Sequence, residues 1–81
     1  MSEHVTPEAA ERLVQAVSSW YAEEIMKERR AGTPDADRMA ELKRQLALCG
    51  ADQQALQDAG PEETAEIAAR YAALARELEG K

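Results

Sequence analysis

Residues 6–35 decide the fold, and they read TPEAAERLVQAVSSWYAEEIMKERRAGTPD. The opening TPE is a helix start, because the Thr6 hydroxyl can accept a backbone N–H, proline is tolerated in the first turn, and an early carboxylate suits the helix dipole. Nothing interrupts the helical pattern before Gly32, and the bases of the segment 27–30 suit the carbonyl end of a helix. This stretch predicts a first helix over about residues 7–31.

The same start signal recurs directly after this glycine. TPD at 33–35 repeats the Thr-Pro-acid order, which predicts a second helix over 34–49 and a link of about two residues. A link this short forces the two helices to lie antiparallel. Gly50 is expected to end the second helix as a left-handed cap. The centre of the predicted fold is therefore a long helical hairpin.

Two further helices complete the prediction. The segment 52–59 begins with a capping Asp and holds one large apolar residue, which predicts a short linking helix. GPEE at 60–63 is another start signal, and the last helix is expected over 61–79. No segment alternates β-branched residues in the manner of a strand. The predicted fold class is all-α: a small antiparallel helical bundle, in one domain over 1–81 with a flexible tail over 1–6.

The core of this bundle can only be thin. Apolar residues make up 44% of the chain, but 17 of its 81 residues are alanine and none is phenylalanine. Cys49 has no partner for an internal disulfide, and His4 is the single histidine, so we expect no metal site and no cofactor. Stability must come from helix packing or from self-association.

The charge pattern argues against general nucleic-acid binding. The net charge is −6, whereas a phosphate-binding surface needs concentrated Lys and Arg. Bases outnumber acids only in the segment 27–44, and acids dominate on both sides of it. The N-terminus has no signal-peptide pattern, and no apolar run approaches the roughly 20 residues that cross a bilayer. We therefore expect a soluble, cytoplasmic protein without membrane contact.

Two glutamates fall within the apolar face of the first helix. Glu24 and Glu28 lie one turn apart, where like charges repel. They could form a carboxylate pair for metal or acid–base chemistry, or they could share Arg38 of the second helix as a counter-charge. Carboxylate metal sites in bundles combine several glutamates with helical histidines. No helical histidine exists here, so the sequence favours pairing with Arg38.

No known catalytic motif is present. A phosphate-binding glycine loop, a Ser/His/Asp set and an HExxH motif are all missing, and the single histidine lies in the tail. Cys49 fits a small buried hydrophobe better than a reactive thiol, which needs a cationic or histidine partner. We therefore predict a small protein–protein interaction module with no catalytic residue and no small-molecule substrate.

An alternative function comes from residues 38–59. LALCGADQQAL at 46–56 resembles a helix-turn-helix, a DNA-binding motif, at its glycine and at its apolar positions. The helix after the glycine carries two aspartates and no Lys or Arg that could contact phosphate. A degenerate DNA-binding motif and a DNA-mimicking regulator therefore stand as alternatives, and the acidic segments make mimicry the better of the two.

The expected protein partner includes a second copy of the chain. A first helix of about 37 Å cannot be covered along its length by a second helix of about 24 Å. Trp20 lies at the edge of the apolar face, where tryptophan is often an interface anchor. We therefore predict a homodimer, in competition with a compact monomer in which the last helix provides the cover. The predicted interface residues are Leu13, Val17, Trp20 and Tyr21.

Overall fold

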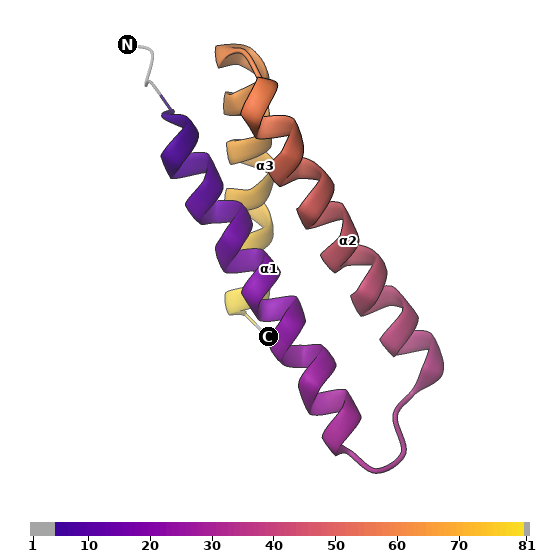
Figure 1. The fold of residues 1–81 in the computed structure, drawn as a ribbon. Coiled ribbons are helices and arrows are strands. Elements are labelled where there is room, and N and C mark those ends of the chain that lie inside the picture. The colour runs from indigo at the N-terminus through magenta and orange to yellow at the C-terminus, as the bar shows by residue number, and fades with distance from the viewer. Residues whose placement is uncertain (1–4, 81) are drawn as a thin grey trace.

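The computed structural model describes residues 5–80, which form three helices. α1 spans Pro7–Arg30, α2 spans Ala36–Asp58 and α3 spans Pro61–Glu79. α1 and α2 form an antiparallel hairpin, and α3 runs back along it from the open end (Figure 1). Residues 5–80 contain no strand, so the predicted all-α bundle is confirmed.

α1 begins at the predicted position. The Thr6 hydroxyl accepts the backbone N–H of Ala9 at 3.1 Å, which satisfies one of the first free donors of the helix. Val5 packs against the core. The predicted flexible tail therefore divides in two: residues 1–4 lie outside the described residues, whereas the next two belong to the packed start of α1.

The link between the first two helices is longer than predicted. Asp35 rather than Thr33 is the N-cap of α2, because the Asp35 carboxylate accepts two backbone N–H groups of the first turn at 3.0 and 3.1 Å. α2 consequently begins at Ala36 instead of residue 34. Gly32 adopts a φ of 80°, which only glycine reaches without steric cost, and so lets the chain reverse direction.

The prediction that Gly50 ends the second helix is wrong. α2 continues through Gly50 to Asp58, and the predicted separate helix over 52–59 is its second half. The buried residues of α2 are spaced seven apart and share one face, and a turn at Gly50 would divide that row. They are Leu42, Cys49 and Leu56. Packing of this row outweighs the roughly 1 kcal/mol by which glycine disfavours a helix.

The core lies at the open end of the hairpin. α1 packs against both neighbours, whereas α2 and α3 contact each other much less. α3 starts at the open end and stops short of the turn, so the turn end of the hairpin consists of two helices only (Figure 1). The buried cluster draws on all three helices: Ala10, Val14, Val17, Cys49, Leu56, Ile67, Ala68, Tyr71 and Leu78.

Substituting Gly50 tests the continuous helix. We expect Gly50→Ala to raise the free energy of unfolding by about 0.5–1 kcal/mol, because alanine is the better helix former. The structure has room for it, since a Cβ built at Gly50 meets nothing within 4 Å. Urea unfolding followed by circular dichroism, at the lowest practical protein concentration, measures the change.

Gly32→Ala is the matched control for this substitution. It should lower stability, because φ is positive at Gly32 and alanine is strained there. If Gly50→Ala destabilised the protein as Gly32→Ala does, Gly50 would be a left-handed cap between two helices.

Candidate functional site

The four predicted interface residues belong to the core or pack against it, and Val17 and Trp20 line a pocket together with residues of α3. Val17 is only 1% exposed and belongs to the core. Leu13, Trp20 and Tyr21 are partly buried and pack against the same core. The rings of Trp20 and Tyr21 meet edge to face, with centroids 5.1 Å apart. The first helix therefore obtains much of its cover within the chain, and Val17 is almost completely buried.

Trp20 forms one wall of an apolar pocket between α1 and the end of α3. The pocket has a volume of about 170 Å³. It is lined by Ala16, Val17, Trp20, Ala75, Leu78 and Glu79. Glu79 is the one charged residue in this lining, so the pocket can receive a small apolar side chain but offers little to orient a polar ligand.

Arg38 is the shared counter-charge of the two glutamates near the hairpin turn. Its Nη2 lies 3.0 Å from Oε1 of Glu24, and its Nε lies 3.2 Å from Oε2 of Glu28. Lys27 also pairs with Glu24 at 3.0 Å. Glu28 accepts the backbone N–H of Asp35 at 3.0 Å. The predicted pairing is confirmed, and these contacts tie α1 to the start of α2.

A polar contact that sequence reasoning missed joins α2 to α3. Tyr71 is 3% exposed and donates its hydroxyl to the carboxylate of Asp52. Nη2 of Arg70 lies 3.7 Å from the other oxygen of that carboxylate. Tyr71 and Asp52 are 19 residues apart in the sequence. No local pattern links them, because their proximity depends on how α3 lies against α2.

Cys49 is buried in the core, as predicted. It is 2% exposed and lies in the same cluster as Tyr71. Burial raises the pKa of the thiol, so Cys49 stays protonated at neutral pH. Because the thiolate is the reactive form, this cysteine is poorly suited to act as a nucleophile.

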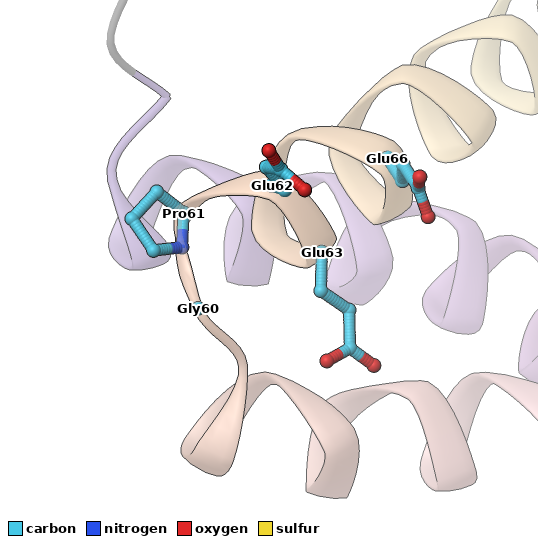
Figure 2. A pocket seen from close by; sticks show the side chains of 5 residues that line it. All are labelled: Gly60, Pro61, Glu62, Glu63 and Glu66. Atoms are coloured by element: carbon cyan, nitrogen blue, oxygen red, sulfur yellow. The ribbon is translucent and has the colours of Figure 1, made fainter.

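The N-terminus of α3 borders an open acidic depression, shown in Figure 2. Its lining consists of Gly60, Pro61, Glu62, Glu63 and Glu66. The three glutamates project from the first turns of α3 in different directions (Figure 2). Carboxylates at this end of a helix interact favourably with its dipole, which accounts for them without a ligand.

Residues 5–80 offer neither a metal cluster nor a membrane-spanning helix. No three His, Cys, Asp or Glu side chains in this part of the chain are grouped so that they could hold a metal ion. Its helices also lack the combination of length and apolar character that crossing a bilayer requires.

The helix-turn-helix that the sequence offered as an alternative around residues 38–59 is not formed, because α2 has no turn at Gly50. Its glycine and its apolar positions lie within α2, which is continuous from Ala36 to Asp58. A recognition helix in this motif must leave the preceding helix at a turn before it can enter a groove. The DNA-mimicking alternative does not depend on this turn and stays a prediction.

The chain matches no protein-family model, and no curated protein or solved structure matches it either. The described residues define a small three-helix protein in which α1 is the central element. What it can do is therefore inferred from its own surfaces and charges.

The stability of the protein should fall as pH rises above about 10. Burial, together with the hydrogen bond to Asp52, raises the pKa of Tyr71 above its ordinary value of 10.0. Between the pKa of the unfolded chain and the higher pKa of the folded one, Tyr71 keeps its proton only in the folded protein. Its contribution to the free energy of unfolding is therefore complete below the unfolded pKa and decreases as the pH rises above it. Urea unfolding at about pH 8 and about pH 11 measures this loss.

Tyr71→Phe is the control for this pH dependence. It removes the titrating group but keeps the ring, so the variant should lose less stability between the two pH values than the wild type. An equally steep loss in the variant would assign the alkaline instability to other groups.

Proposed function

We propose that this chain is a small, cytoplasmic protein–protein interaction module without catalytic activity, whose partner is a second copy of itself. The main support for this proposal is that α3 covers only part of the hairpin formed by α1 and α2. α1 and α2 contain 24 and 23 residues, whereas α3 contains 19 and packs mainly on α1. One side of the hairpin therefore has no third helix along its entire length, and the turn end has none on either side (Figure 1).

The shape of the molecule supports contact with a partner. Its Cα atoms extend over 50 × 25 × 16 Å, so the molecule is long and flat. At the turn end, which α3 does not reach, the hairpin is one helix deep (Figure 1). Two large apolar side chains, Met26 and Leu48, are each 50% exposed. A contact that reached either of them would bury apolar surface that is exposed to water in the single chain.

The chemistry of the described side chains supports a role in binding rather than catalysis. The hydroxyl of Tyr71 and the thiol of Cys49, whose pKa values are both raised, lie in the core in their neutral forms. A general acid or a nucleophile needs an accessible reacting atom near its substrate. A single buried thiol is also compatible with the reducing conditions of the cytoplasm.

The mass in solution tests the proposed function. At tens of micromolar protein, light scattering should give twice the 8.9 kDa of one chain, and the mass should fall on dilution. A mass of one chain at every concentration would contradict self-association and with it the proposed partner.

DNA binding is expected to be absent. With a net charge of −6 and no glycine turn in α2, the protein should not bind labelled mixed-sequence duplex at micromolar concentration. Fluorescence anisotropy at low and high salt measures this. Tight binding that weakens with salt would instead favour the DNA-binding alternative.

A further inference from the structure

The side of the hairpin opposite α3 is one continuous surface, here called the back face. Glu11 and Gln15 of α1 line one depression together with Gln53 and Gln57 of α2. These four residues therefore mark the sides of α1 and α2 that form the back face. Residues seven apart lie on the same side of a helix. The rows on α1 therefore run Glu11–Ser18, which ends toward the buried Ile25, and Gln15–Ala22–Arg29.

The corresponding rows on α2 run Gln53–Leu46–Met39 and Gln57–Gly50–Lys43. Gly50 lies about 200° around α2 from Asp52, the residue that contacts α3, at 100° per residue. In Figure 1, α3 lies behind the hairpin. The back face is on the side away from α3 and therefore points toward the viewer. No helix of residues 5–80 covers it.

Nothing in residues 5–80 requires a glycine at position 50. Gly50 lies inside a helix, it has no positive φ, and a Cβ added to it meets nothing within 4 Å. Glycine at such a position costs about 1 kcal/mol relative to alanine. Glycine at such a position permits the close approach of another backbone. At the same level of the hairpin, α1 presents Ser18 and Ala22, which are also small.

The charges at the two ends of the back face are opposite. Arg29 and Lys43 lie at the turn end, and among residues 5–80 neither is within salt-bridge distance of a carboxylate. The open end carries Glu8 and Glu11 in the first turns of α1 and Asp58 at the end of α2. A second copy in reversed orientation would place each turn end over the open end of its partner.

We propose that the back face binds the same face of a second copy, turn end against open end, about a two-fold axis that passes across Gly50. This inference rests on the proposed self-association and names its surface. Lys43 and Gln57 are each seven residues from Gly50 along α2. A two-fold axis across Gly50 therefore places Lys43 of one copy over residues 57–58 of the other. On α1 the axis passes near Ser18, so Arg29 lies over the acidic first turns of the partner's α1.

A second arrangement of the two back faces, with the two-fold axis parallel to the helices, would bring like charges together. A two-fold axis parallel to the helices would stack turn end on turn end and bring Arg29 beside the Lys43 of the other copy. It would also set the acidic open ends against each other. Like charges in contact are unfavourable, so charge selects the reversed arrangement over this one.

A bulky residue at the axis tests the surface. Gly50→Leu should raise the dimer dissociation constant roughly tenfold or more, because its side chain prevents the close approach of the two helices. Leucine is a good helix former, so the variant should stay as helical as the wild type by circular dichroism. Trp20→Ala, which changes the α3 side of α1, is the matched control and should stay dimeric.

Self-cross-linking tests the axis directly, because a residue on a two-fold axis meets its own copy. In a Cys49→Ala background, Gly50→Cys should form a disulfide-linked dimer with oxidised glutathione. Leu48→Cys in the same background should form far less, since Leu48 lies about 200° around α2 from Gly50. Equal cross-linking of the two variants would overturn the proposed axis.

A charge swap tests the orientation. Lys43→Glu should weaken the dimer by opposing Asp58 of the other copy, and adding Asp58→Lys in the same chain should restore it. If the swapped protein were no tighter than Lys43→Glu alone, the reversed arrangement would be wrong.

The outcomes separate the two proposals. A wild type that is monomeric at all concentrations overturns the proposed function and the back face together. A dimeric wild type that resists Gly50→Leu but dissociates with Trp20→Ala keeps the proposed function, overturns the back face, and moves the interface to the α3 side.

Discussion

The structure depends on one apolar face of α1 that two helices share. Ala10, Val14 and Val17 are almost completely buried because α2 and α3 both pack against α1, while those two helices contact each other little. A chain rich in alanine and without phenylalanine has few large side chains with which to build a second such face. The position of these three residues near the start of α1 places the core at the open end of the hairpin, and α3 lies there because that is where apolar surface is available.

The turn end of the hairpin is held by few buried side chains and by ion pairs. Arg38 bridges Glu24 and Glu28, and only Ile25 and Leu42 are buried large side chains in this half. Ion pairs with one half-exposed partner contribute about 0–1 kcal/mol each, less than a well-packed apolar core supplies. The molecule therefore has a packed half and a lightly held half, and both halves expose the back face. Self-association along that face would add contacts to Arg29 and Lys43 in the lightly held half.

Gly50 connects the fold to the proposed dimer. Within one chain it only weakens α2, and the helix persists because the buried row of α2 lies on both sides of it. At a close contact between two copies the same glycine becomes favourable, since it removes the side chain that would hold the backbones apart. In the proposed dimer, the acidic open end would lie over Arg29 and Lys43 of the turn end, which among residues 5–80 have no carboxylate within salt-bridge distance.

The sequence by itself determined the starts of α1 and α3, the hairpin with Gly32 in its link, and the pairing of Arg38 with two glutamates. These features are local: a cap acts within one turn, and the short link places Arg38 beside the glutamates of the preceding helix. Only the tertiary structure decided that α2 continues through Gly50 and that Tyr71 meets Asp52. Both depend on which face of each helix lies against α1. A glycine is a helix end or a helix interior according to packing partners distant in the chain, and a free energy of about 1 kcal/mol in local preference is too small to decide between them.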